Sequence, residues 1–309
     1  MELVPSFHFS IGLRTFTRSL EKNKVVQSLH LVFLSLLVLL ESEASEKPEC
    51  LKKLKTLEEK KMEEILVYFS LKYQGDFMKI LEALQKKERV TEEERKKALE
   101  SVECCYTTII SEDYPYALQD IKCPPFVLFY KGNLELLNND LVNIVGTKKN
   151  DEYGKKITQS VVKTLIENDV TLIEENNQGI EKVVVDTVQE NNKEVIVVLN
   201  DGIECETNQT LIDSIRQNGL VISEYPGTKR KTKKSCMFSR RMSAGLCSKV
   251  IVTQSGIKSE SMVSASYALE AYKDVYVFPE AYDSKFKGNN KLIKEGANII
   301  TNMEDLVDN

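Results

Sequence analysis

Short apolar runs that alternate with helical stretches are the feature of this sequence that most restricts its fold. Beyond Val127 the runs fall at residues 141–145, 171–173, 194–199, 220–223, 249–253 and 275–279. Their hydrophobicity is continuous rather than alternating, as in strands that are covered on both faces. Helical spacing of apolar residues separates the runs, for example at 153–167 and 208–218. The pattern predicts an α/β fold with a Rossmann-like, doubly wound, mostly parallel sheet.

A small helical region is expected before this sheet. From Met62 the apolar residues follow a helical spacing that is broken at Gly75, and a third helix is expected after Thr91. Thr91 and Glu94 have the spacing of a capping box, in which each side chain bonds the other residue's backbone N–H. The charges of residues 86–97 alternate in sign, which is typical of a solvated helix face rather than a nucleic-acid site.

The first 61 residues do not match either pattern. Residues 29–40 form an apolar run behind several basic residues, like a signal peptide or short anchor. The run is shorter than the roughly 20 residues that a membrane-spanning helix needs. We favour the interpretation that residues 1–61 are an extension outside the fold, with Met62 as the natural start. The expected division is therefore an extension (1–61), a small helical domain (62–105) and a Rossmann-like domain (106–309).

Several kinds of chemistry are excluded by what the sequence lacks. The two histidines, His8 and His30, precede both predicted domains, so histidine bases, nucleophile systems and metal ligands are not expected there. The sequence has no G-x-G-x-x-G and no G-x-x-x-x-G-K-[ST] motif, and its seven cysteines include no C-x-x-C pair. We expect reduced thiols in a cytoplasmic protein, no catalytic residue, no cofactor and no metal.

One segment carries a strong local positive charge in an acidic chain. The formal net charge of the chain is −5, yet no acidic residue lies between Glu224 and Glu260. A segregation this complete, beside the carboxyl edge of a parallel sheet, favours contact with a polyanion. The basic residues of this charged segment are Lys229, Arg230, Lys231, Lys233, Lys234, Arg240, Arg241, Lys249 and Lys258.

From about Thr107 to Val307 the sequence resembles the Smf/DprA family. The similar pieces, in order, include PPFVLFYKG (124–132), IVGTKK (144–149), SEYPGT (223–228), AGL (244–246) and GNNKLI (288–293). The resemblance implies a Rossmann-like protein without enzymatic activity that binds and protects single-stranded DNA during natural transformation. It also implies that the protein helps to load the RecA recombinase and acts as a homodimer.

The resemblance and the charge pattern together suggest a set of DNA-binding residues. Lys148, Lys149, Lys155, Arg240 and Arg241 are expected to contact phosphates, and the lysines and arginine of 229–234 are expected to attract DNA at longer range. Gly146 is expected to let the backbone approach the ligand. The full expected set is Gly146, Thr147, Lys148, Lys149, Lys155, Gly179, Lys229, Arg230, Lys231, Lys233, Lys234, Arg240 and Arg241.

The sequence departs from the family pattern at positions that would face an anion. Glu174 and Glu175 replace a Ser-Gly pair, and we expect them at a helix N-terminus, where they would repel a phosphate. Glu260 replaces a glycine. These acidic residues favour an alternative, a degenerate Rossmann scaffold that binds a protein partner but no DNA. A third hypothesis is an enzyme like the phosphoribohydrolases, although their Pro-Gly-Gly-x-Gly-Thr loop is missing.

Overall fold

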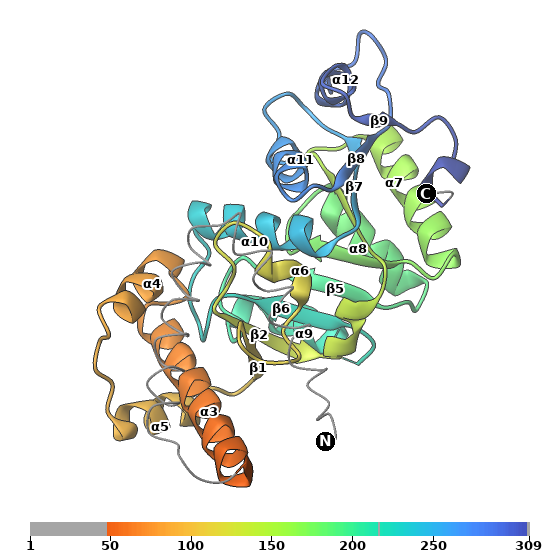
Figure 1. The fold of residues 1–309 in the computed structure, drawn as a ribbon. Coiled ribbons are helices and arrows are strands. Elements are labelled where there is room, and N and C mark those ends of the chain that lie inside the picture. The colour runs from red at the N-terminus through yellow and green to blue at the C-terminus, as the bar shows by residue number, and fades with distance from the viewer. Residues whose placement is uncertain (1–47, 216, 308–309) are drawn as a thin grey trace, which may run out of the picture.

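A mixed sheet forms the centre of the molecule (Figure 1). The computed structural model describes residues 48–215 and 217–307. In these residues nine strands are arranged in the order β1-β2-β6-β5-β4-β3-β7-β8-β9. Strands β3 to β9 pair in parallel, whereas β2 runs antiparallel to both β1 and β6. The predicted α/β, mostly parallel fold is therefore confirmed. The strands are β1 (Cys105–Thr108), β2 (Val127–Gly132), β3 (Leu141–Gly146), β4 (Thr171–Glu175), β5 (Val195–Val198), β6 (Leu220–Ser223), β7 (Lys249–Gln254), β8 (Asp274–Val277) and β9 (Asn298–Ile299).

The strand order creates a switch point between β3 and β7. The chain moves from β3 outward through β4 and β5 to β6, and then returns past β3 to add β7, β8 and β9 on the other side. In doubly wound sheets, ligands bind at the carboxyl ends of the strands where the order reverses. The loops after β3 and β7 therefore border the crevice in which a ligand is expected.

Helices cover both faces of the sheet (Figure 1). Helices α7 and α8 pack together on one face, and α10 and α11 pack together on the other. The α-helices are α3 (Pro48–Lys72), α4 (Phe77–Gln85), α5 (Glu92–Glu100), α6 (Tyr116–Gln119), α7 (Glu152–Glu167), α8 (Ile180–Glu190), α9 (Gln209–Ile215), α10 (Lys233–Leu246), α11 (Ser261–Glu270) and α12 (Gly288–Lys294). Short 3-10 helices are η1 (Leu134–Asn138), η2 (Glu206–Asn208) and η3 (Glu304–Leu306).

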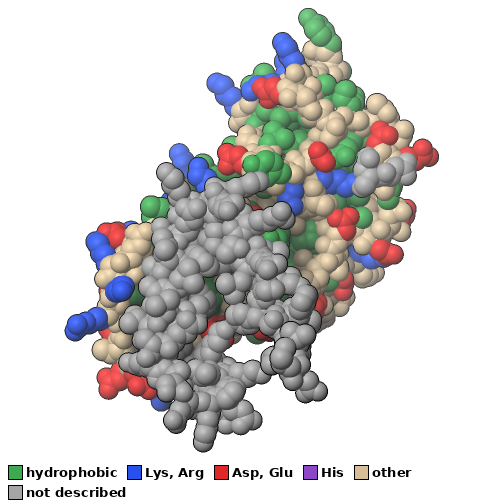
Figure 2. All heavy atoms as spheres, in the orientation of Figure 1, with side chains coloured by type: hydrophobic (Ala, Val, Ile, Leu, Met, Phe, Trp, Pro, Cys, Tyr) green, Lys and Arg blue, Asp and Glu red, His purple; other side chains and the backbone are tan. Residues whose placement is uncertain are grey.

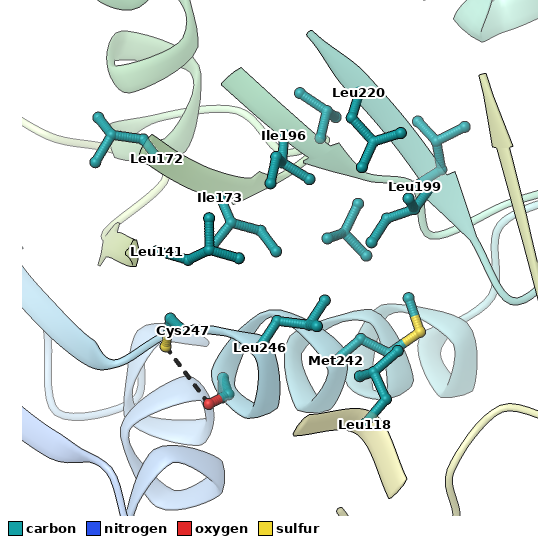
Figure 3. Close-up of a cluster of buried hydrophobic side chains, with 14 of the residues drawn as sticks. Leu118, Leu141, Leu172, Ile173, Ile196, Leu199, Leu220, Met242, Leu246 and Cys247 are labelled. Atoms are coloured by element: carbon teal, nitrogen blue, oxygen red, sulfur yellow. Dashed lines mark hydrogen bonds between the residues drawn. The ribbon is translucent and has the colours of Figure 1, made fainter. Parts of the chain in front are cut away.

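The packing of α10 against the sheet shows how the core fixes this helix. Figure 3 shows Leu141 and Ile173 of the strands facing Met242 and Leu246 of α10. These side chains are all buried. Burial of each large apolar side chain is worth about 1.5–3 kcal/mol. The core therefore holds α10, and the arginines it carries, in a fixed position relative to the carboxyl edge of the sheet.

Two polar side chains replace part of the backbone ladder between β3 and β4. Backbone pairing joins only Leu141 to Thr171 and Val142 to Leu172. Farther along, the Asn143 amide donates to the carbonyl of Ile173 at 2.7 Å, and the backbone N–H of Ile144 donates to the Glu174 carboxyl at 2.7 Å. The side chains satisfy backbone groups that would otherwise be buried without partners.

The N-terminal helices pack directly onto the sheet domain. The capping box predicted for Thr91 and Glu94 is confirmed at the start of α5. Gly75 has a φ of +68° between α3 and α4, and the Phe77 ring stacks on Phe126 with 5.0 Å between centroids. Buried residues of α3 and α4 belong to the same apolar cluster as the sheet. The division predicted between residues 61 and 62 falls within α3.

Residues 1–47 of the predicted extension lie outside the described residues. They include the apolar run at residues 29–40. Among residues 48–215 and 217–307, no helix has both the length and the apolar character that crossing a membrane requires.

Candidate nucleic-acid interface

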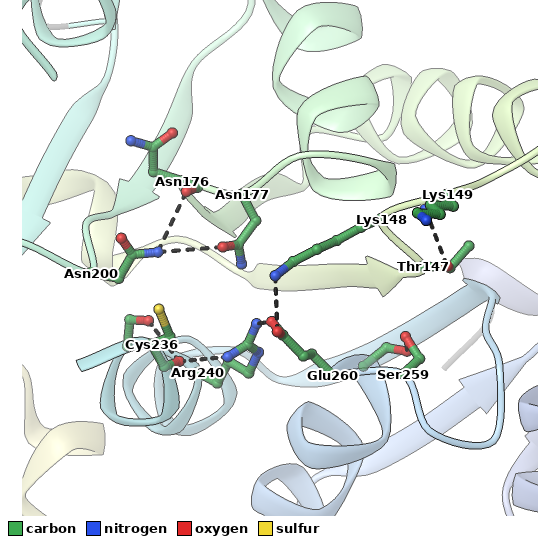
Figure 4. Close-up of polar contacts among 12 residues, drawn as sticks. Thr147, Lys148, Lys149, Asn176, Asn177, Asn200, Cys236, Arg240, Ser259 and Glu260 are labelled. Atoms are coloured by element: carbon green, nitrogen blue, oxygen red, sulfur yellow. Dashed lines mark hydrogen bonds and ion pairs between the residues drawn. The ribbon is translucent and has the colours of Figure 1, made fainter. Parts of the chain in front are cut away.

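Two of the predicted DNA-binding cations converge at the switch point. Lys148 lies in the loop after β3, and Arg240 projects from α10 (Figure 4). Both contact Glu260, which lies immediately before α11: Lys148 Nζ is 2.9 Å from Glu260 Oε1, and an Arg240 guanidinium nitrogen donates to Glu260 Oε2. Lys148 is 112 residues from Glu260 in sequence and Arg240 is 20 residues from it, and the three form one cluster whose centre is a carboxylate.

The surroundings of Glu260 keep its carboxyl ionised. Partial burial opposes ionisation, but the hydrogen bond and charge of Lys148 and the charge of Arg240 outweigh it and lower the pKa of Glu260 below its ordinary value. Arg240 is only 3% exposed, and it also donates to the carbonyl of Cys236 at 2.7 Å. The two cations are therefore partly neutralised by a carboxylate of the same chain.

Three asparagine side chains that are not among the predicted site residues complete this edge. Asn176 and Asn177 follow β4, and Asn200 follows β5 and donates to the Asn177 side-chain oxygen at 3.3 Å. Figure 4 shows Asn177 pointing toward the amine of Lys148. Asn177 Nδ2 and Arg240 Nε are both buried donors without a hydrogen-bond partner. The signal in the sequence for Asn200 is its position directly after the apolar run 194–199, whereas Asn176 and Asn177 lie three and four residues past the run 171–173.

The two predicted glycines have structural roles in the loops. A Cβ on Gly146 would lie 2.3 Å from Ile180 Cγ1, so this glycine permits close packing of α8. The space beside the Gly146 Cα is thus taken by Ile180, and the approach of a ligand to the Gly146 backbone stays a prediction. Gly179 has a φ of +92°, and a Cβ there would lie 2.4 Å from Lys148 Cα. Gly179 thus allows the start of α8 to support the loop that carries Lys148.

The predicted position of Glu174 and Glu175 is wrong. Both belong to β4 and are fully buried, and α8 begins only at Ile180. Burial raises the pKa of Glu174 well above its ordinary value, with a smaller contribution from the Glu175 charge. Burial also raises the pKa of Glu175, against the effect of Arg240. Burial thus opposes the ionisation of both carboxyls, and neither lies at a helix N-terminus.

A third buried carboxyl, Glu181, lies in the first turn of α8. Burial, followed by the charge of Glu175, raises the pKa of Glu181 to about 8. One of its oxygens has no hydrogen-bond partner. The interior beside the candidate interface thus holds three buried carboxyl groups, Glu174, Glu175 and Glu181, whose pKa values are all raised by burial.

Arg241 does not join Arg240 at the interface, contrary to the sequence prediction. Its side chain is 4% exposed and pairs with the equally buried Glu224 at 2.9 Å. It also donates to the carbonyls of Lys122 and Cys123. Because these groups occupy its donors, Arg241 serves to join α10 to the chain segment before β2.

The charged segment between Glu224 and Glu260 does not form one continuous surface. Lys229 donates to the carbonyl of Gln74 at 2.7 Å, and Lys234 pairs with Asp76 at 2.9 Å, so both bind the N-terminal helices. Burial lowers the pKa of Lys229 to about 8. Lys249 is buried and donates to the carbonyl of Leu306. On the visible face in Figure 2, basic and acidic side chains are interspersed.

The other predicted cations remain at the surface. Lys149 and Lys155 are exposed near the end of β3, where the backbone N–H of Lys149 donates to the hydroxyl of Thr147 at 3.2 Å. Arg230, Lys231 and Lys233 are also exposed, at the N-terminal end of α10. Within the part of the chain that the structure describes, no group of three or more His, Cys, Asp or Glu residues could hold a metal ion.

Comparison with known proteins places this geometry in a family. The DNA processing protein DprA of Streptococcus pneumoniae is 31% identical over 204 residues, which cover 65% of this chain and 72% of the relative. Its X-ray structure aligns with a TM-score of 0.65 and 28% identity, covering 74% of this chain and 80% of that chain. DNA processing protein A of Helicobacter pylori, whose structure describes a single-stranded DNA binding mode, aligns with a TM-score of 0.59 and 27% identity over 67% of this chain and 95% of that one. The family model for DNA recombination-mediator protein A matches residues 105–309, and the chain belongs to this family.

Proposed function

We propose that this recombination-mediator protein binds the phosphate backbone of single-stranded DNA at the carboxyl edge of β3, β4 and β7, and that it performs no chemistry on the DNA. The observation that carries the proposal is the convergence of Lys148, Arg240 and Asn177 on one point of the switch-point crevice. Donors from three separate segments are suited to an anion. The solved relative from Helicobacter pylori, described as binding single-stranded DNA, supports the choice of ligand.

The exposed cations extend the proposed contact in two directions. Lys149 and Lys155 continue it along the start of α7, whereas Lys233 lies seven residues before Arg240 on α10. Seven residues of helix span about 10 Å, so these cations could contact phosphates of the same strand. Arg230 and Lys231 would add attraction at longer range.

The proposal is tested by the salt dependence of binding to a fluorescently labelled oligo(dT). If about five phosphates are contacted, the logarithm of affinity should fall with the logarithm of salt concentration with a slope near −3.5. Lys148→Ala should weaken binding and reduce the magnitude of this slope by about 0.7, the value for one contact with single-stranded DNA. Fluorescence anisotropy over a series of salt concentrations measures both quantities.

Lys163→Ala is the matched control for this experiment. Lys163 is exposed on α7, toward the end of the helix that is remote from the β3 loop. The control removes the same charge, so it should leave the slope within experimental error of the parent. Equal slopes for the parent, Lys148→Ala and Lys163→Ala would place DNA elsewhere on the molecule and would contradict the proposed interface.

The partners implied by the family resemblance remain part of this proposal. We expect the protein to act in the cytoplasm as a homodimer and to deliver bound DNA to the RecA recombinase. Sedimentation at several protein concentrations tests the dimer. Strand-exchange assays with RecA, in which this chain is present or omitted, test the transfer of DNA.

A second candidate function is supported by one observation. Glu260 already neutralises Lys148 and Arg240, which would suit a scaffold that has lost DNA binding and keeps a protein partner. Under this alternative neither the parent nor a variant without the Glu260 charge binds oligo(dT), even at low salt. The two functions are therefore separated by the behaviour of Glu260.

A further inference from the structure

We propose that Glu260 is an internal substitute for a DNA phosphate, and that it must leave Lys148 and Arg240 before the interface can bind a strand. The inference rests on the proposed DNA-binding function and adds a residue that controls it. Glu260 accepts hydrogen bonds from Lys148 and Arg240 through separate oxygens, as a phosphate would. The carboxylate thus occupies the position of the expected ligand.

Glu260 can turn away from this cluster, whereas Arg240 cannot. The Glu260 side chain is 48% exposed, much as Lys148 is at 49%, and it lies just before α11, so a rotation about its side-chain bonds would carry the carboxylate into solvent. Arg240, in contrast, is buried and is held by the carbonyl of Cys236. A competing anion would therefore displace Glu260 and find Arg240 already in position.

The cluster has donors that Glu260 does not use. Arg240 Nε and Asn177 Nδ2 are buried without a partner, although unsatisfied buried donors are costly. Both oxygens of Glu260 already accept a hydrogen bond. A phosphate group offers more acceptor oxygens than one carboxylate, so it suits this set of donors better than Glu260 does.

The internal carboxylate should make the interface selective for strands that make several contacts. Glu260 attracts both Lys148 and Arg240, and this attraction is stronger near a protein surface than in water, so the need to displace Glu260 opposes the binding of any single anion. A strand that also reaches Lys149, Lys155 and Lys233 gains enough from these contacts to displace it. Small phosphate compounds do not.

Glu260→Gln tests the inference, because glutamine keeps the shape and one acceptor oxygen but removes the charge. The variant should bind labelled oligo(dT) about tenfold more tightly than the parent, which corresponds to about 1.4 kcal/mol. We expect inorganic phosphate to bind to the variant more tightly than to the parent. The broadening of the ³¹P line of phosphate measures this binding. Glu270→Gln removes the same charge from the other end of α11 and should change neither affinity by more than about twofold.

A double-mutant cycle tests whether the gain acts through the cluster. When Lys148 is replaced by alanine, Glu260→Gln should increase DNA affinity by less than it does in the parent, because one of the released cations is gone. An equal gain in both backgrounds would mean that Glu260 acts through general charge and would overturn the inference. Circular dichroism of each variant establishes that the fold is retained.

The possible results separate the inference from the proposed function. If the parent binds DNA and Glu260→Gln binds DNA and phosphate no better, the substitute role is wrong while DNA binding stands. If Glu260→Gln binds phosphate more tightly but neither protein binds DNA, the substitute role stands and the proposed function fails. If neither ligand binds to either protein, both are wrong.

Discussion

Arg240 and Arg241 are adjacent in sequence but lie in different environments. Successive residues of an α-helix point about 100° apart, so only one of two neighbours can face a given site. Arg240 faces the β3 loop and Glu260, whereas Arg241 faces Glu224 and the carbonyls of Lys122 and Cys123. Composition does not reveal the rotation of a helix, so the sequence alone predicts phosphate contact for both arginines.

Substitution of Arg241 should therefore affect stability. Removal of one partner from a buried ion pair leaves the other charge without compensation, at a cost of about 3–5 kcal/mol. We expect Arg241→Ala to lower the free energy of unfolding by about that amount, as measured by urea denaturation. Arg230→Ala, at an exposed position, should change it by less than about 0.5 kcal/mol. If Arg241→Ala were as stable as the parent but bound DNA more weakly, Arg241 would be a DNA-binding residue after all.

Glu181 should give the protein an unusual dependence of stability on pH. Burial raises its pKa to about 8 in the folded protein, from an ordinary value of 4.5. Because the folded state retains this proton while the unfolded state loses it, the stabilising contribution is complete below about pH 4.5 and is lost as pH rises toward 8. One such group changes the free energy of unfolding by at most about 1.4 kcal/mol per pH unit within that window.

Glu181→Gln should remove this dependence, because glutamine does not titrate. We expect urea denaturation between pH 5.5 and 8 to show that the free energy of unfolding of the variant rises relative to that of the parent as the pH increases. The exposed Glu190→Gln, at the end of the same helix, serves as a control with no such trend. A constant difference between the parent and Glu181→Gln would contradict the raised pKa.

The strands are the elements that the sequence predicts best. The site depends also on the packing of helices and on buried polar contacts. Continuous apolar runs identify buried strands, and the predicted runs agree with β3 to β8 to within one or two residues. The position of Glu174 could not be predicted in this way, because a carboxyl that replaces backbone pairing looks like a loop residue in the sequence. The contact between Lys148, Arg240 and Glu260 depends on how α10 and α11 pack, and no local pattern contains that information.

The N-terminal helices contact the sheet domain at β1, β2 and the segment around residues 224–234. Lys229 and Lys234 bind Gln74 and Asp76, and a Cβ on Gly75 would lie 2.5 Å from the carbonyl oxygen of Glu224. Part of the positive charge that suggested a DNA surface thus holds the helices in place. The buried side chains on both sides form one apolar cluster, as expected for a single cooperative unit.

Truncation at two positions should distinguish a shared core from separate domains. A chain of residues 62–309 keeps Leu66 and the other buried side chains described for α3 and α4, so it should unfold in one transition near that of the full chain. A chain of residues 106–309 loses Phe77 and uncovers Phe126, which is 2% exposed in the intact protein. Exposure of several large apolar side chains costs about 1.5–3 kcal/mol each, so its Tm should fall by roughly 10 °C or more. Differential scanning calorimetry measures both transitions. An unchanged Tm for residues 106–309 would show that the helices form an independent domain, which is what the sequence division at residue 105 predicts.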